Sequence, residues 1–143
     1  MSERVNEITT SERMIMRIIW TMGQVTSRQV INALSDSGWS ESTVKTLLNR
    51  LETKKVISSR FDKNRKIYSA NISEAAAAQQ VGDDLLNEIC AMQVGKTLMN
   101  IIDESDISKS DINLLIQQLT EKLKSAPETV MCNCMVDNSE GLV

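Results

Sequence analysis

The order of patterns over residues 11–70 constrains the fold most: three amphipathic segments are followed by one hairpin pattern. Apolar residues at helical spacing predict helices over about residues 11–22, 27–35 and 41–54. β-Branched and aromatic residues on both sides of a polar turn predict a β-hairpin over residues 56–70. With one Pro and five Gly, the chain also lacks the turn residues of an all-β protein. We therefore expect a mainly α fold with a small β-wing, a winged helix-turn-helix followed by further helices.

The third segment, residues 41–54, has two contrasting faces. One face is an apolar stripe, and the other carries hydroxyls, an amide and cations without an acidic residue. A helix about 10–12 Å across fits the major groove of DNA. In that groove, Arg and Asn contact base edges, while Ser, Thr and Lys hold phosphates. The candidate DNA-binding residues of this helix are Ser42, Thr43, Lys45, Thr46, Asn49 and Arg50.

The predicted hairpin is basic near its tip, so its cations would reach the DNA backbone beside the third helix. An unrelated small domain with a solvated helix and a soluble hairpin is the alternative interpretation. The candidate DNA-binding residues of the wing are Arg60, Lys63, Arg65 and Lys66.

Composition excludes several classes of function. The chain has no His, which excludes Ser-His-Asp and Cys-His catalysis and every His-containing metal site. Because no Gly-rich phosphate loop or paired catalytic constellation is present either, we expect no enzyme activity. No apolar run approaches the ~18 residues of a membrane span. The first ten residues lack the apolar core of a signal peptide, so we expect a soluble, cytoplasmic protein without a membrane partner.

The net charge of −3 is unevenly distributed along the chain. Residues 1–72 carry 12 basic and 7 acidic residues, whereas residues 73–143 carry 4 and 12. The first half is therefore basic enough to bind nucleic acid, although the whole chain is acidic. We predict a winged-helix DNA-binding domain over residues 1–72, a helical dimerisation domain over 73–126 and a flexible metal-binding tail over 127–143.

Two further helices are predicted, from Glu74 to about Met99 and from Ser108 to about residue 124. Their apolar faces are too broad to stay in water and need a cover. Helix-turn-helix proteins usually dimerise, so that two recognition helices meet successive half-sites. A second copy of the chain is the favoured cover, and packing onto residues 1–72 in a monomer is the alternative. The candidate dimerisation residues are Leu85, Ile89, Met92, Ile112, Leu115 and Leu119.

The tail carries a C-x-C motif at Cys132 and Cys134, with a Met on either side. Thiolates select soft ions such as Cu(I) and Zn(II), and thioethers also suit Cu(I). One such motif supplies two strong ligands, whereas Zn(II) prefers four, so the two tails of a dimer could combine. Two incidental thiols are the alternative. Cys90 lies in an apolar helical row and is interpreted as a core residue rather than a ligand.

Several stretches resemble the BlaI/MecI/CopY family of repressors. They are the run from Thr10 to Trp20, the run WSESTVKTLLNRL over residues 39–51, and the wing residues 65–70. The tail motif at residues 132–135 resembles the copper-responsive CopY/TcrY branch. The resemblance implies a homodimeric repressor that binds operators with TACA and TGTA arms before copper-export operons. It further implies Zn(II) as co-repressor, Cu(I) as the inducer that displaces Zn(II) and releases DNA, and a copper chaperone as a further partner.

Two departures from the family pattern keep other functions open. The copper branch typically ends in two C-x-C pairs, but Ser139 and Gly141 stand where the second pair would fall. The β-lactam-responsive members are inactivated by cleavage of an Asn-Phe bond, and the nearest match here is Asn100-Ile101. The alternatives are a repressor of β-lactam resistance genes inactivated by proteolysis, and a copper-binding protein that does not bind DNA.

Overall fold

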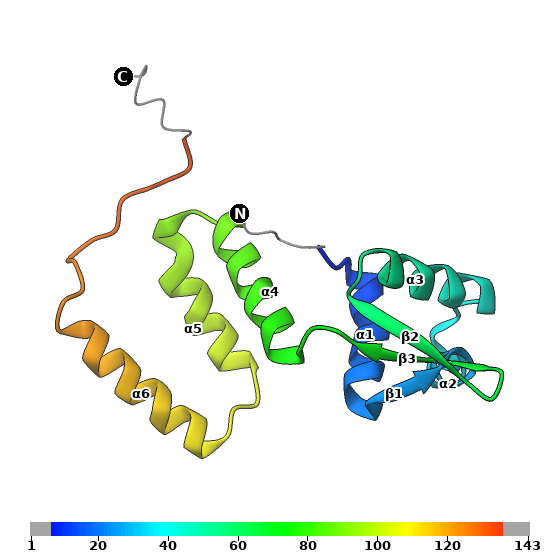
Figure 1. Cartoon of the computed structure of the whole chain (residues 1–143). Helices are drawn as coiled ribbons and strands as arrows, with labels where there is room; N and C mark the ends of the chain where they lie inside the picture. The colour runs from blue at the N-terminus through cyan, green and yellow to red at the C-terminus, as the bar shows by residue number, and fades with distance from the viewer. Residues whose placement is uncertain (1–6, 136–143) are drawn as a thin grey trace. The chain divides into compact units, whose positions relative to one another are not determined.

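The structure, a computed structural model, describes residues 7–135 and divides into two compact units between Gln80 and Val81 (Figure 1). The elements of the first unit, in chain order, are α1 (Thr10–Met22), β1 (Gln24–Thr26), α2 (Ser27–Ala33), η1 (Ser35–Ser37), α3 (Glu41–Thr53), β2 (Ile57–Asp62), β3 (Arg65–Ala70) and the first turns of α4 (Glu74–Glu88). The second unit contains the rest of α4, η2 (Ala91–Gln93), α5 (Val94–Glu104) and α6 (Lys109–Leu123).

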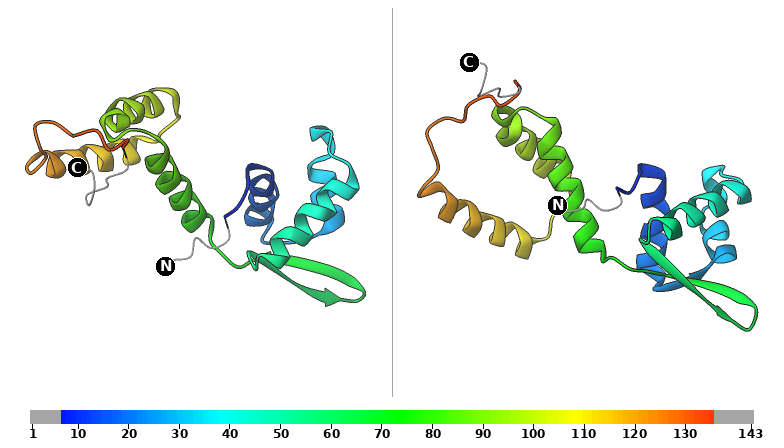
Figure 2. Two further views of the ribbon diagram at one scale, coloured as in Figure 1. Left: turned by 90° about the horizontal axis from the view of Figure 1, so that it is seen from above. Right: turned by 45° about the horizontal axis from the view of Figure 1, so that its top comes forward.

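The first unit is the expected three-helix body with a β-wing, which confirms the predicted fold class. The wing is a hairpin with a two-residue turn. The turn residues, Lys63 and Asn64, have φ angles of 55° and 70°. Positive φ at both positions is the requirement of a type I′ turn, which matches the twist of paired strands. Figure 2 shows this hairpin extending away from the helices.

The sheet has a third strand that the sequence pattern did not reveal. β1 pairs antiparallel with β3, so the strand order is β1-β3-β2. A strand of three residues is too short to show an alternating pattern. Its middle residue, Val25, is 1% exposed and belongs to the core between the sheet and the helices.

The core of the first unit is aliphatic and is supplied mainly by one face of each helix. Burying such side chains contributes about 1.5–3 kcal/mol each, which fixes α3 against α1 and α2. The fully buried aliphatic residues at its centre are Ile15, Met16, Ile19, Val30, Leu48 and Leu51.

In the second unit, the predicted continuous helix over residues 74–99 is wrong. α4 ends at Glu88, and the chain turns through Cys90, whose backbone is extended, before α5 begins. The apolar rows continue across the turn, so periodicity alone cannot locate it. The turn is held by hydrogen bonds, since Gln93 N donates to Cys90 O at 2.8 Å and Ala91 N donates to the Asn133 side chain at 2.8 Å.

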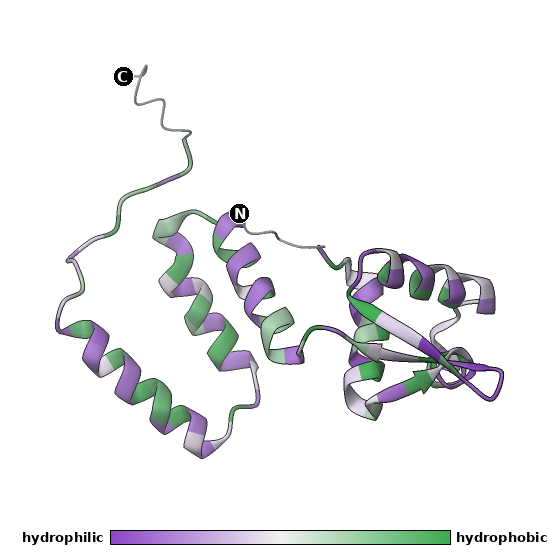
Figure 3. Cartoon of the chain, viewed as in Figure 1, coloured by the Kyte–Doolittle hydropathy of each residue, from purple (hydrophilic) through white to green (hydrophobic). Residues whose placement is uncertain are grey.

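The last helix is as predicted. Ser108 caps α6, and its side chain accepts a hydrogen bond of 3.0 Å from Asp111 N. Apolar residues recur along α5 and α6 (Figure 3), and many of them remain exposed. Among the described helices, none is long and apolar enough to cross a membrane.

Candidate functional site

The helix α3 presents its polar face to solvent because its apolar stripe is buried. Val44, Leu47, Leu48 and Leu51 are at most 5% exposed. The opposite face is exposed at every predicted DNA-binding position of this helix: Ser42, Thr43, Lys45, Thr46, Asn49 and Arg50.

Four of these side chains are available to a ligand. Within residues 7–135, the side chains of Lys45, Thr46, Asn49 and Arg50 make no hydrogen bond and no ion pair. The charge of Lys45 acts on Glu41 without forming an ion pair and helps to lower the pKa of Glu41. Unpaired cations and an amide on one exposed helical face are the donors that bind base edges and phosphates.

The start of α3 is fixed by hydroxyl groups and by an ion pair. The Ser40 side chain accepts a hydrogen bond of 3.1 Å from Thr43 N and lies 3.0 Å from the Thr43 hydroxyl. Arg28 of α2 donates to Glu41 at 2.8 Å, and this hydrogen bond and the opposite charge lower the pKa of Glu41 and raise the pKa of Arg28. The sequence interpretation missed this pair, which joins α2 to α3 and neutralises the carboxylate nearest the polar face.

The wing cations differ in their surroundings. Lys63 and Arg65 are exposed at the hairpin turn, and Arg60 donates to the Gln24 side chain at 3.1 Å. Lys66 is instead held by Glu52 of α3 at 3.1 Å, with its ammonium 5.4 Å from the centre of the Tyr68 ring.

Glu52 connects the hairpin to α3. Its carboxylate also accepts a hydrogen bond from the Ser59 hydroxyl, and the bonds from Ser59 and Lys66 lower the pKa of Glu52. The structure therefore places Lys66 in a contact that orients the wing on α3, whereas Lys63 and Arg65 point to no partner in the described chain.

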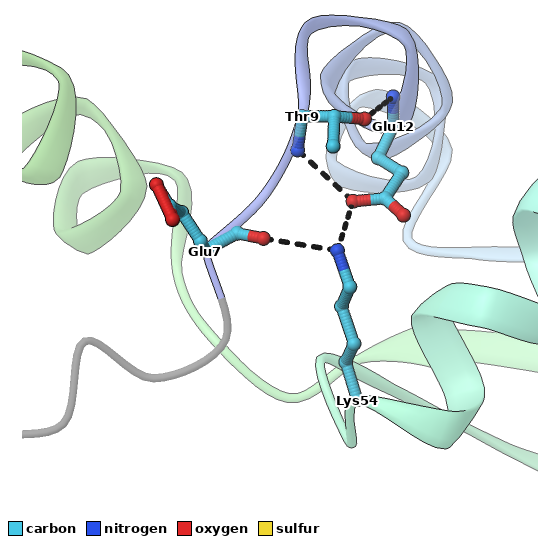
Figure 4. Close-up of polar contacts among 4 residues, drawn as sticks. All are labelled: Glu7, Thr9, Glu12 and Lys54. Atoms are coloured by element: carbon cyan, nitrogen blue, oxygen red, sulfur yellow. Dashed lines mark hydrogen bonds and ion pairs between the residues drawn. The ribbon is translucent and has the colours of Figure 1, made fainter.

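A buried carboxylate fixes the other end of α3 (Figure 4). Glu12 is 0% exposed, and its Oε1 accepts hydrogen bonds from Thr9 N at 2.9 Å and from Lys54 Nζ at 2.6 Å. Lys54 also donates to Glu7 O at 3.0 Å, whereas Glu12 Oε2 is buried without a hydrogen-bond partner in the described chain. Burial raises the pKa of Glu12, but Lys54 and Thr9 outweigh it, so the pKa is lowered overall.

The contact between Glu12 and Lys54 joins the start of α1 to the end of α3, which positions the exposed face of α3. The capping box of Thr9 and Glu12 is visible in the sequence. The partner Lys54 is not, because the two residues are 42 positions apart.

The second unit contains a cluster of three thiols. The sulfur atoms of Cys90, Cys132 and Cys134 all lie within 4.8 Å of one another. The interpretation of Cys90 as a core residue is therefore wrong: the helix break places it, partly exposed, beside the tail. No sequence spacing predicts this cluster, because the break that creates it is not visible in the pattern.

The thiols of this cluster shift the pKa values of Cys90 and Cys134. The pKa of Cys90 is lowered by the backbone N–H of Met92 and by the thiols of Cys134 and Cys132. The pKa of Cys134 is raised to about 12 by the thiols of Cys90 and Cys132. Three sulfur donors suit soft ions such as Cu(I) and Zn(II). Ser139 and Gly141 lie outside the described residues.

The candidate dimerisation residues line helices with much exposed apolar surface. Leu85, Ile89 and Leu115 are half-buried, whereas Met92, Ile112 and Leu119 are 57%, 41% and 56% exposed. A groove of about 470 Å³ on α6 is lined by apolar residues that include Ile116, Leu119 and Leu123.

A three-helix body with an unpaired cationic face on α3 and a basic hairpin beside it defines a winged-helix DNA-binding protein. The family model of the penicillinase repressor matches residues 8–121, so the chain belongs to the penicillinase repressor family. Membership in this family of DNA-binding transcriptional repressors confirms the BlaI/MecI part of the resemblance and the expectation that the chain is not an enzyme.

Two curated proteins and one solved structure are similar to this chain over half of its length or more. An uncharacterized 16.5 kDa protein in the ptsI 3′ region of Latilactobacillus sakei is 41% identical over 136 residues, which cover 94% of this chain and 93% of that protein. The penicillinase repressor of Bacillus licheniformis is 28% identical over 59% of this chain and 67% of its own length. The solution structure of the DNA-binding domain of the repressor BlaI covers 52% of this chain and 92% of that chain, with 28% identity and a TM-score of 0.46.

Proposed function

We propose that this chain is a homodimeric repressor of a copper-export operon and is released from its operator when Cu(I) binds at the cysteine cluster. The observation that carries the copper assignment is the group of three thiols within 4.8 Å in a chain of a repressor family. Cu(I) is the inducer in this proposal, Zn(II) is the co-repressor, and a copper chaperone is the source of Cu(I).

The DNA end of the proposal rests on α3 and the wing. Lys45, Asn49 and Arg50 reach base edges in the major groove, and Lys63 and Arg65 hold phosphates beside it. Operators with TACA and TGTA arms are the proposed target, because the sequence of α3 resembles the family that reads them. A twofold-symmetric operator requires two copies of α3, and a second copy of the chain would also cover the exposed apolar faces of α5 and α6.

The proposed regulation by copper rests on α4, which connects the wing to the cysteine cluster. Three residues separate the end of the wing strand β3 from the start of α4, which leads to the turn that carries Cys90. When bound, Cu(I) supplies bonds that draw the three sulfurs together. A change in the position of Cys90 is thus passed along α4 to residues 71–73, where Ile72 O accepts a hydrogen bond of 2.9 Å from the Trp20 side chain. Cu(I) releases DNA only to the extent that it binds the DNA-free protein more tightly than the DNA-bound protein.

The cysteine cluster favours copper over proteolytic control. Asn100 and Ile101, the nearest match to the Asn-Phe cleavage site, lie inside α5, where the backbone is helical rather than extended. A copper-binding protein that does not bind DNA is disfavoured by membership in a family of repressors.

The DNA end is tested by fluorescence anisotropy with a duplex that carries TACA and TGTA arms, at fixed salt concentration. We expect Arg50→Ala and Lys45→Ala each to weaken binding by about 1–3 kcal/mol, which is the usual cost of a lost base contact. Lys109→Ala, which removes a cation from the start of α6, is the matched control and keeps full affinity. Unchanged affinity in both α3 variants would remove α3 from the interface.

A further inference from the structure

We infer that Cys90 is the third ligand of a soft-metal site that each chain completes by itself with Cys132 and Cys134. This inference deepens the proposed function and rests on it, because it assigns the ligands and the stoichiometry of the proposed copper switch. It differs from a site bridged between the tails of two chains, which the C-x-C motif alone suggests.

The distances between the sulfur atoms fit one metal ion. With metal–sulfur bonds of about 2.3 Å, three thiolates around one ion lie about 4.0 Å apart. The three sulfurs already lie within 4.8 Å of one another, so closure requires a shift of less than 1 Å. Cys132 and Cys134 are exposed and Cys90 is partly exposed, which leaves the sulfurs accessible to an incoming ion.

Hydrogen bonds within the chain hold the tail beside Cys90. Asn133, between the two tail cysteines, accepts a hydrogen bond of 2.8 Å from Ala91 N, the residue after Cys90. Cys134 N in turn donates to the Cys132 sulfur at 3.4 Å. A pocket of about 320 Å³ is lined by Cys90, Asn133 and Cys134, with Glu88 adding a negative charge that favours a cation. The helix break thus supplies both the third thiol and the group that positions the other two.

Three thiolates favour Cu(I) over Zn(II). Cu(I) is satisfied by two or three thiolates, whereas Zn(II) prefers four ligands and must take a fourth from solvent or from another chain. Each of the three thiols loses its proton to solvent as its sulfur binds the ion. No electron is transferred, since copper enters and remains as Cu(I).

The test is an anaerobic titration of the full chain with Cu(I), using two readouts. Near-ultraviolet thiolate-to-copper absorption counts the ions bound per chain, and X-ray absorption counts the sulfur ligands per ion. We expect one Cu(I) per chain with three sulfurs in the wild type, and two sulfurs in Cys90→Ser. Competition with a chromophoric chelator should show Cys90→Ser binding Cu(I) at least ~10-fold more weakly, since changes outside the ligand shell already cost that much.

Two further variants separate ligation from structure. Gln93→Ala alters an exposed side chain of the same turn, keeps all three thiols and should behave as the wild type. Asn133→Ala removes the anchor, so it should weaken Cu(I) binding while the bound ion keeps three sulfurs.

Each outcome decides between the two proposals. If Cys90→Ser keeps three or more sulfurs per ion and wild-type affinity, the intrachain site is wrong while copper regulation stands. If the wild type binds no Cu(I), the proposed copper function itself fails. If ions in the wild type are shared between two chains, with half an equivalent per chain, the bridged arrangement replaces this one.

Discussion

Three ion pairs in the first unit fix α3, while other cations of α3 and of the wing face solvent without a partner in the part of the chain that the structure describes. Arg28 with Glu41, Lys66 with Glu52, and Lys54 with Glu12 tie α3 to three neighbouring elements. Of these, Glu12 with Lys54 should contribute most, because Glu12 is 0% exposed while the other two pairs are partly or largely in water.

Lys54→Ala should lower the free energy of unfolding of the first unit by about 2–3 kcal/mol, since it leaves the Glu12 carboxylate buried without its charged partner. Trp20 and Trp39 both lie in this unit, so tryptophan fluorescence during urea unfolding reports its stability. Arg28→Ala breaks an exposed pair and serves as the control, with a much smaller change. Equal losses in the two variants would contradict a special role for the buried carboxylate.

Glu12 should also make stability depend on pH in a definite direction. Its pKa is lower in the folded chain than in the unfolded chain, so its contribution is complete above its ordinary pKa. The contribution is lost as pH falls from the ordinary pKa of a glutamate through the lower pKa that Glu12 has in the folded chain. The stability advantage of the wild type over Glu12→Gln should therefore shrink between about pH 6 and pH 3.

Glu41 and Glu52, whose pKa values are also lowered, are present in both proteins and cancel in this comparison. The measurement is urea unfolding followed by tryptophan fluorescence at a series of pH values. A difference between the two proteins that stays constant over this range would rule out Glu12 as the source.

At the scale of elements, the helices and strands that local sequence patterns determine could be predicted from the sequence. α3 was predicted with nearly its observed bounds because Ser40 caps it and Val44, Leu47 and Leu48 form an unbroken stripe. The hairpin was predicted because its strands and its two-residue turn are adjacent in sequence. The helix α3 and the hairpin carry the candidate DNA-binding residues, so this part of the site can be predicted from the sequence.

Features that depend on contacts between distant parts of the chain could not be predicted from the sequence. β1 exists only because β3, more than 40 residues later, pairs with it. The break between α4 and α5 interrupts no apolar row, and one of the N–H groups in the break, that of Ala91, donates to the Asn133 side chain in the tail. The third thiol of the cysteine cluster was therefore assigned to the core, since its position depends on that break.

The unpaired cations of the wing should differ from the paired Lys66 in how they affect the salt dependence of DNA binding. Lys63→Ala and Arg65→Ala should each reduce the slope of log affinity against log salt concentration by ~1 per bound chain, because each chain loses one phosphate contact. Lys66→Ala should change the slope less and lower the stability of the first unit instead, since Lys66 is already paired with Glu52. Anisotropy titrations at several salt concentrations measure the slopes. A full unit of slope lost in Lys66→Ala would place that side chain on DNA.

At the scale of the whole molecule, the proposed function requires two copies of the chain on a symmetric operator. Leu119→Glu should convert the proposed dimer to a monomer in sedimentation experiments, since it introduces a charge into the apolar face of α6. Operator affinity should fall with it, because one α3 cannot occupy both half-sites. Gln118→Glu adds the same charge one position away and should leave the dimer intact. A Leu119→Glu protein that sediments as the wild type does would exclude α6 from the dimer interface.

In the proposed switch, thiols in the second unit control DNA binding by the first. The most direct test is fluorescence anisotropy of the operator duplex bound to the full chain, with Cu(I) added anaerobically at fixed salt and Zn(II) as the control. We expect Cu(I) to release the duplex from the wild type, Zn(II) to leave it bound, and the double variant Cys132→Ser/Cys134→Ser to keep it under both metals. A wild-type complex that persists at saturating Cu(I), or a double variant that Cu(I) still releases, would contradict copper control through this cluster.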